Sequence, residues 1–343
     1  MIAEDTAPAP RALTRPPRLG FAGVGWIGRH RMQAMLETGL VEAAAVLDPS
    51  PDMAAEALKL APGAARADDF EGLLAMDLDG VVIATPSALH ADQAIQALRR
   101  GAAVFCQKPL GRDAAEAGAA VAAARTTDRL LCVDFSYRFT EAMRAVRGRI
   151  GDGELGRVHA VDLVFHNAYG PDKPWFYDPG LSGGGCLMDL GVHLVDLALW
   201  TLGFPEVERI DADLFAGGRP LTAGAVEDYA AATLRLSSGA VVRIACSWRL
   251  PAGCEAVISA AFYGERGGAA MRNVGGSFYD FTAELYRGCE TQVLTSPPDA
   301  WGGRAAADWA QRLARGARFD PEAERFVAVS QVLDRIYATA GRA

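Results

Sequence analysis

The chain carries a glycine pattern, G-x-G-x-x-G, directly after an apolar run and directly before a helical pattern. Its glycines are Gly23, Gly25 and Gly28, and a helix is expected from Ile27 to about Glu37. In this setting the first glycine permits a tight turn, the second lets backbone N–H groups approach a pyrophosphate, and the third lets the helix pack closely on the strand. The pattern predicts a dinucleotide-binding loop. The alternative is an incidental glycine-rich turn.

A second strand-like run, residues 42–47, ends at Asp48, twenty residues after Gly28. A carboxylate at this position can accept hydrogen bonds from the adenosine ribose and repels a 2′-phosphate, so we expect NAD rather than NADP. The alternative is that Asp48 only opens a turn before Pro49. The two residues before the last glycine, Trp26 and Ile27, complete the predicted cofactor loop.

Short apolar runs alternate with Ala-rich helical patterns from Arg18 to about Leu131, which predicts a doubly wound parallel sheet. After the glycines at 151 and 153 the pattern changes to alternating strands, interrupted by a helix expected over 184–202 and followed by C-terminal helices. We therefore expect an α/β protein: a Rossmann domain at 18–140, and an α+β domain with a large, mostly antiparallel sheet at 141–343. The C-terminal helices are free to pack back on the first domain.

Composition restricts the partners. With 343 residues, 22% of them charged, and a formal net charge of −8, the chain favours small-molecule chemistry over nucleic acid or an anionic membrane. Residues 1–17 lack an apolar core and are expected to form a disordered tail, not a signal peptide, which favours a cytoplasmic protein. The apolar stretch 187–204 contains three ionisable residues and is not expected to span a membrane. The six cysteines form no C-x-x-C pair, so we expect reduced, buried thiols and no metal site.

Four further segments lie in a recognisable order: A-T-P-S-A-L-H at 84–90, Q-K-P-L at 107–110, Y-R-F at 137–139 and D-L-G-V-H-L-V-D at 189–196. Together with the glycine pattern they resemble the glucose-fructose oxidoreductase, inositol dehydrogenase and rhizopine-catabolism (Gfo/Idh/MocA) family over nearly the whole chain. The resemblance implies that Lys108 of a Glu-Lys-Pro-like triplet serves nicotinamide and substrate, and that Asp189 and His193 form the acid/base pair. Where the family usually has Glu, this chain has Gln107, which can still accept a ribose hydrogen bond.

The residue types suit this chemistry. Asp189 and His193 are spaced i,i+4, so on an α-helix they share a face with Asp196, and the carboxylate can orient or tune the imidazole. Lys108 follows an apolar strand at the sheet edge where ligands bind, and its ammonium can stabilise a developing alkoxide. The alternatives are a buried polar cluster on the helix and a solvated surface lysine.

Other segments are expected to complete the site. One such segment, at the end of a strand, contains Thr85, Pro86 and His90. It matches the family's loop near the nicotinamide, so the resemblance implies that these residues contact the cofactor. An ordinary helix-capping turn fits the segment equally well. We expect the pocket to be shaped by Tyr137 and Arg138, with an aromatic loop at 166–177 that stacks on a sugar ring or acts as a lid. The loop residues assigned to substrate are Tyr169 and Trp175.

These features predict an NAD-dependent oxidoreductase acting on a carbinol of a sugar, sugar derivative or cyclitol. Two alternatives stay open: a glycosidase- or lyase-type enzyme that oxidises its substrate transiently, and a cofactor-binding sensor without turnover. The free face of the antiparallel sheet predicts a homodimer or homotetramer.

Overall fold

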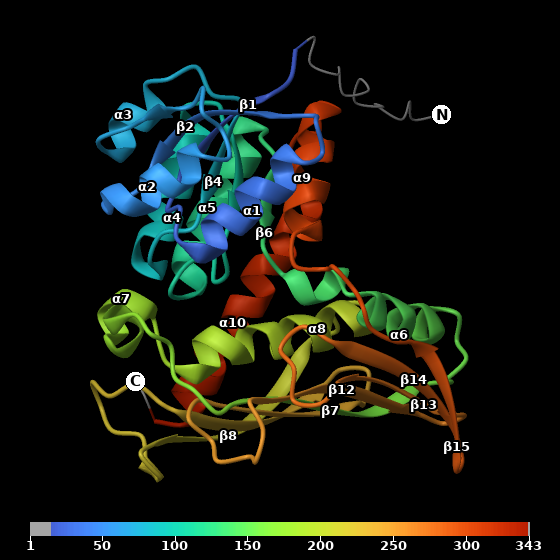
Figure 1. The fold of residues 1–343 in the computed structure, drawn as a ribbon. Helices are drawn as coiled ribbons and strands as arrows, with labels where there is room; N and C mark the ends of the chain where they lie inside the picture. The colour runs from blue at the N-terminus through green and yellow to red at the C-terminus, as the bar shows by residue number, and fades with distance from the viewer. Residues whose placement is uncertain (1–14, 342–343) are drawn as a thin grey trace, which may run out of the picture.

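The computed structural model describes residues 15–341, so the tail expected at 1–17 lies almost wholly outside the described residues. The N-terminal half is built on a six-stranded sheet with the order β3-β2-β1-β4-β5-β6 (Figure 1). Every pairing in this sheet is parallel, as predicted. Its strands are β1 (Arg18–Ala22), β2 (Glu42–Leu47), β3 (Ala65–Arg66), β4 (Gly80–Ile83), β5 (Ala103–Cys106) and β6 (Leu131–Val133).

Helices cover both faces of this parallel sheet. Apolar residues of α1, α2 and the late helix α9 pack on one face, and those of α3, α4 and α5 pack on the other, where the last helix α10 contacts α5. Because both faces are covered, β4 and β5 are buried along their whole length. The helices are α1 (Trp26–Leu36), α2 (Pro51–Leu58), α3 (Phe70–Leu74), α4 (Ser87–Arg99), α5 (Ala114–Thr127), α9 (Arg304–Ala314) and α10 (Glu324–Thr339).

Side-chain caps fix where several of these helices begin. Ser50, Asp69 and Asp113 each accept a hydrogen bond from a backbone N–H in the first turn of the following helix. A 3₁₀ turn at Ser136–Phe139 and helix α6 (Glu141–Gly151) then lead into the second half.

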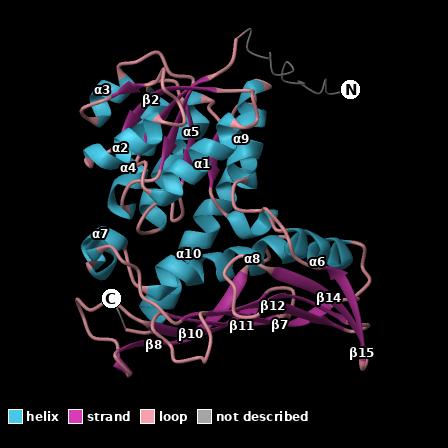
Figure 2. Ribbon diagram, viewed as in Figure 1, coloured by secondary structure: helices cyan, strands magenta, loops and turns pink. Residues whose placement is uncertain are grey.

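The second half is built on a nine-stranded sheet with the order β15-β14-β13-β12-β7-β11-β10-β8-β9. Its pairings are antiparallel except for the parallel pair β7 and β11, so the predicted mostly antiparallel sheet is confirmed. Helices α6, α8 (Val192–Leu202) and α10 lie on one face of this sheet (Figure 2). The strands are β7 (Val158–Asn167), β8 (Val207–Ala216), β9 (Arg219–Pro220), β10 (Tyr229–Leu236), β11 (Val241–Ser247), β12 (Ala256–Gly264), β13 (Gly268–Asn273), β14 (Phe281–Arg287) and β15 (Glu290–Thr295).

The helix expected over 184–202 is not a continuous α-helix. A π-helical segment, Leu187–Gly191, precedes α8, and a short helix α7 (Pro179–Ser182) follows a 3₁₀ turn at Pro174–Tyr177. The helical stretch Pro179–Leu202 is long and apolar enough to cross a membrane by length and composition, but 83% of its apolar segment is buried inside the protein. Most of its apolar surface is therefore used in the core.

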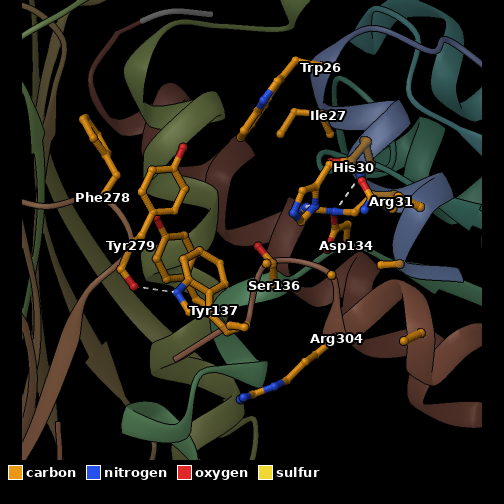
Figure 3. Close-up of a pocket in the computed structure, with 18 of the residues that line it drawn as sticks. Trp26, Ile27, His30, Arg31, Asp134, Ser136, Tyr137, Phe278, Tyr279 and Arg304 are labelled. Atoms are coloured by element: carbon orange, nitrogen blue, oxygen red, sulfur yellow. Dashed lines mark hydrogen bonds and ion pairs between the residues drawn. The ribbon is translucent and has the colours of Figure 1, made fainter. Parts of the chain in front are cut away.

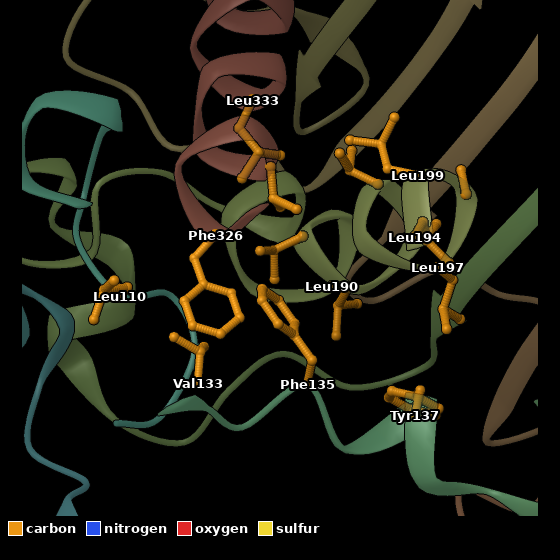
Figure 4. Close-up of a cluster of buried hydrophobic side chains, with 14 of the residues drawn as sticks. Leu110, Val133, Phe135, Tyr137, Leu190, Leu194, Leu197, Leu199, Phe326 and Leu333 are labelled. Atoms are coloured by element: carbon orange, nitrogen blue, oxygen red, sulfur yellow. The ribbon is translucent and has the colours of Figure 1, made fainter. Parts of the chain in front are cut away.

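One apolar cluster joins the two halves. Val133 and Phe135, at the end of the parallel sheet, are buried in the same core as Leu190, Leu194 and Phe326 (Figure 4). Helix α9 contacts α1, and α10 contacts both α5 and α8. The chain therefore enters the second half after β6, returns to the first half at α9, and joins the two halves again through α10. These connections hold the edge of the parallel sheet over the helices of the second half.

Candidate active site

The glycine loop between β1 and α1 has the geometry that its sequence predicts. Gly23 has a positive φ of 80°, and a Cβ there would collide with the backbone of Ala84. A Cβ at Gly28 would collide with the carbonyl oxygen of Gly23, so helix α1 packs tightly on the loop. A Cβ at Gly25 would meet nothing within 4 Å, which leaves open space beside the start of the helix. An anion such as pyrophosphate fits there.

Asp48 lies at the end of β2 and faces this loop. Its Oδ2 accepts a hydrogen bond from the Val24 N–H at 2.8 Å, and its Oδ1 accepts one from the Ser50 N–H at 2.9 Å. Each carboxylate oxygen has a second lone pair for a further donor. The carboxylate is therefore held in place while keeping capacity for ribose hydroxyls, and its contact with the cofactor stays a prediction.

Two cavities meet at the carboxyl edge of the parallel sheet. The larger, about 700 Å³, lies between α1 and the second half, with Phe278 and Tyr279 on one side and His30 and Arg31 on the other (Figure 3). The smaller has a volume of about 270 Å³. Among the predicted site residues, the larger cavity is lined by Trp26, Ile27, Gln107, Lys108, Tyr137 and His193, and the smaller by Ile27, Thr85, His90, Gln107, Lys108, Trp175 and Asp189.

Lys108 stands where the two cavities adjoin, two residues after β5. Its Nζ donates to Asp189 Oδ1 at 2.6 Å and to the Asp189 carbonyl oxygen at 2.7 Å. The other carboxylate oxygen of Asp189 accepts from Trp248 Nε1 at 3.1 Å. Both charged side chains are less than one-fifth exposed, so the ion pair is shielded from water and fixes the ammonium at the cavity wall.

His193 opens helix α8 on the wall of the larger cavity. The residue is 7% exposed, and its ring packs edge-on against Tyr137, with centroids 4.9 Å apart. Its Nδ1 is buried and has no hydrogen-bond partner among the described residues. Burial lowers the pKa of His193 well below the usual value, and the charges of Lys108 and Arg31 lower that pKa further. The imidazole is therefore neutral near pH 7 and can accept a proton.

The predicted pairing of Asp189 with His193 is wrong. Asp189 bonds Lys108 and Trp248, and it lies in the π-helical segment, where the wider turn changes the i,i+4 alignment of an α-helix. Asp196 is also not part of the pair, since it forms a buried ion pair with Arg138. The acid/base candidate His193 and the carboxylate of Asp189 therefore have different neighbours and do not bond to each other.

Arg138 does not line either of these two cavities, which corrects its expected role in shaping the pocket. Its Nε donates to Asp196 Oδ2 at 2.8 Å, and its guanidinium lies 5.2 Å from the ring centroid of Phe135. Burial raises the pKa of Asp196, while the guanidinium acts in the opposite direction. Arg138 therefore serves packing between the two halves.

The loop after β4 is tied to the loop after β5. The ring nitrogens of His90 lie 2.7 Å from the carbonyl oxygens of Pro109 and Thr85, and the ring is buried, which lowers its pKa. The hydroxyl of Thr85 donates to Gln93 at 2.7 Å, and Pro86 immediately precedes α4. His90 therefore supports the loop that carries Lys108, and the cofactor contacts of Thr85, Pro86 and His90 stay predictions.

The aromatic loop contributes one of its two assigned residues to a cavity. Trp175 lines the smaller cavity and stacks on Phe176 with centroids 3.8 Å apart. Tyr169 is 54% exposed, lines neither of these cavities, and donates from its hydroxyl to Glu255 at 3.3 Å. Its assignment to the substrate is therefore not supported by this structure.

Several lining residues were missed by sequence reasoning. They include Arg31, Asp134, Tyr279 and Trp301, all on the larger cavity. Asp134 directly follows β6, so the rule that ligands bind at the carboxyl edge of the sheet could have identified it. The loops bearing Tyr279 and Trp301 carry no comparable signal, because only the tertiary fold brings them to α1.

The parallel sheet, the glycine loop and the lysine at the cavity junction define a Rossmann-type, NAD-binding oxidoreductase. Residues 18–135 match the model of an oxidoreductase family with an NAD-binding Rossmann fold, and residues 143–270 match the GFO/IDH/MocA C-terminal domain. The chain therefore belongs to the Gfo/Idh/MocA family, as its sequence motifs indicated.

Known proteins support this assignment. Inositol 2-dehydrogenase of Rhizobium meliloti (strain 1021) is 30% identical over 258 residues, which are 75% of this chain and 76% of the relative. D-glucoside 3-dehydrogenase of Escherichia coli (strain K12) is 27% identical over 235 residues, which are 65% of this chain and 64% of that relative. A levoglucosan dehydrogenase structure with NADH and levoglucosan shares the fold, with a TM-score of 0.81 at 23% identity, covering 95% of this chain and 97% of that one.

Proposed function

We propose that this protein is an NAD-dependent dehydrogenase that oxidises a carbinol of a sugar, sugar derivative or cyclitol. The observation that carries the proposal is the placement of Lys108 at the junction of two cavities, with the neutral ring of His193 on the wall of the larger one. The smaller cavity adjoins the loop at Thr85 and suits the nicotinamide, and the larger suits the substrate.

The residues at the junction have complementary roles. His193 accepts the hydroxyl proton, because its lowered pKa keeps the ring unprotonated at neutral pH. Lys108, fixed by Asp189, donates a hydrogen bond to the substrate oxygen and stabilises the negative charge that develops there. The open space at Gly25 and the carboxylate of Asp48 would hold NAD, which supplies the hydride acceptor when bound.

A polyhydroxylated substrate is supported by the cavity walls and by the relatives. Aromatic rings at Tyr137, Tyr279 and Trp301 line the larger cavity together with polar groups at Gln107 and Arg31. Such a mixture suits a ring with apolar faces and polar edges. The relatives at 27% and 30% identity are named as glucoside and inositol dehydrogenases.

The test is a panel of sugars, cyclitols and sugar acids, each incubated with NAD or NADP. NADH formation is followed by absorbance, and the products are identified by mass spectrometry. We expect net NADH with at least one polyol and a product two hydrogens lighter. Cleavage or elimination without net NADH would indicate the glycosidase- or lyase-type activity instead. Binding of NAD and a sugar without any product would indicate a sensor.

A further inference from the structure

A buried polar cluster lies beside Lys108 on the wall of the larger cavity. Asp134 is 1% exposed, and its Oδ2 accepts from Arg31 Nε at 2.5 Å and from Gln107 Nε2 at 2.7 Å. Its Oδ1 is buried and has no partner among the described residues. Backbone bonds from Asp134 to Cys106 and from Gln107 to Ile83 fix both main chains at the sheet edge.

The contact with Asp134 decides how the Gln107 amide is oriented. An ionised carboxylate can only accept hydrogen bonds, so the amide NH₂ must face Asp134 and the amide oxygen must face away from it. Among the described residues nothing donates to that oxygen. Gln107, like Lys108, lines both cavities, so its amide oxygen is a neutral acceptor available at their junction.

A glutamate at position 107 is incompatible with this arrangement. It would place a second carboxylate at hydrogen-bond distance from Asp134. Repulsion between two carboxylates that share such a site strongly raises the pKa of one of them, so that both are not ionised together. Asp134, Arg31 and Gln107 together carry one negative and one positive charge. The carboxylate at 134 and the amide at 107 therefore form a matched pair.

We infer that Asp134 is a positioning residue that fixes Gln107 as the acceptor for a hydroxyl group at the cavity junction. This inference rests on the proposed function, in which that hydroxyl belongs to the cofactor ribose or to the polyol substrate.

The inference is tested by a double-mutant cycle of Gln107→Glu, Asp134→Asn and the double variant. The double variant again pairs one amide with one carboxylate, since the amide introduced at position 134 can donate to the carboxylate introduced at position 107 and accept from Arg31. The NAD dissociation constant, measured by tryptophan fluorescence, changes if Gln107 binds a ribose hydroxyl. The KM of an identified polyol changes if Gln107 binds a substrate hydroxyl. Thermal unfolding without ligand reports the effect on the fold.

We expect each single variant to weaken one of these two affinities about tenfold, and the double variant to return to within about threefold of wild type. The Gln107→Glu variant should also bind the affected ligand better as the pH falls, because either the introduced carboxylate or that of Asp134 must take a proton. The matched control is Gln96→Glu, whose exposed amide donates to Asp92 at 2.6 Å and should change neither affinity.

Additive losses in the double variant, or single variants that bind as well as wild type, would overturn the inference. If Gln107→Glu fails to fold, folding of the double variant supports the pairing and its failure to fold contradicts it. The NAD affinity and the unfolding cycle need no turnover. A lack of dehydrogenase activity would therefore refute the proposed function while leaving the pairing to be decided by these two measurements.

Discussion

Replacing Gly25 or Gly28 by alanine separates cofactor binding from folding. A methyl group at Gly28 would lie much closer to the Gly23 carbonyl oxygen than 3.0 Å, the distance below which Cβ contacts are essentially never observed. Because the obstacle is backbone, helix α1 must move by more than ~1 Å, and overpacking of this kind costs about 1–3 kcal/mol. Gly25 has a φ of −61° and nothing within 4 Å of the added methyl, so its unfolding free energy should change by less than ~0.5 kcal/mol.

The assay is thermal unfolding with and without saturating NAD. At one hundred times its dissociation constant a ligand stabilises the folded state by about 2.7 kcal/mol, which is a measurable rise in Tm. Gly25→Ala should keep the ligand-free Tm but lose most of this rise, since its methyl occupies the space for the pyrophosphate. Gly28→Ala should lower the ligand-free Tm. A full NAD-induced rise in Gly25→Ala would refute the assignment of the loop.

Three further predictions follow from the same structure. Asp48→Ser combined with Pro49→Arg should weaken or reverse a preference for NAD over NADP, and equal efficiency with both cofactors in the wild type would contradict the role of Asp48. Because burial and the Lys108 charge lower the pKa of His193, turnover should fall only as the pH drops below the usual histidine range. Lys108→Met should raise that pKa, so the remaining activity of this variant should begin to fall at a higher pH than that of the wild type. Light scattering should show a dimer or tetramer, and a lone 36.3 kDa species at micromolar concentration would count against association through the free sheet face.

Local sequence patterns predicted most of the parallel half, but not strand β3 or helix α3. Strand β2 begins and ends at the predicted residues, because a continuous apolar run bounded by helical patterns has few other interpretations. The strands β13, β14 and β15 and helix α6 were not predicted. Their short, mixed stretches acquire a clear inside and outside only when the sheet is assembled.

The site was predicted where a local rule applied and missed where tertiary contacts decided. Lys108 stands at a strand end, where ligands bind in such sheets, but an isolated lysine there is usually a surface group, so its role was implied by the family resemblance. The separation of Asp189 from His193 depends on a π-helical segment that the i,i+4 spacing does not reveal, and the partners of Arg138 and Asp134 come from distant elements. Tyr169 is a further example, because the sequence of an aromatic loop does not indicate whether a given ring faces a cavity or the solvent.

The central claim is that His193 and Lys108 carry the chemistry, while NAD is held mainly by the glycine loop and Asp48. It is tested most directly by the turnover number and the NAD dissociation constant of His193→Ala and Lys108→Ala, measured on a substrate that the wild type oxidises. We expect turnover to fall roughly a hundred- to ten-thousand-fold in each, with NAD affinity changed little, and the wild-type acid limb to vanish in His193→Ala. Near-normal turnover with an unchanged pH profile in His193→Ala would show that another group is the base.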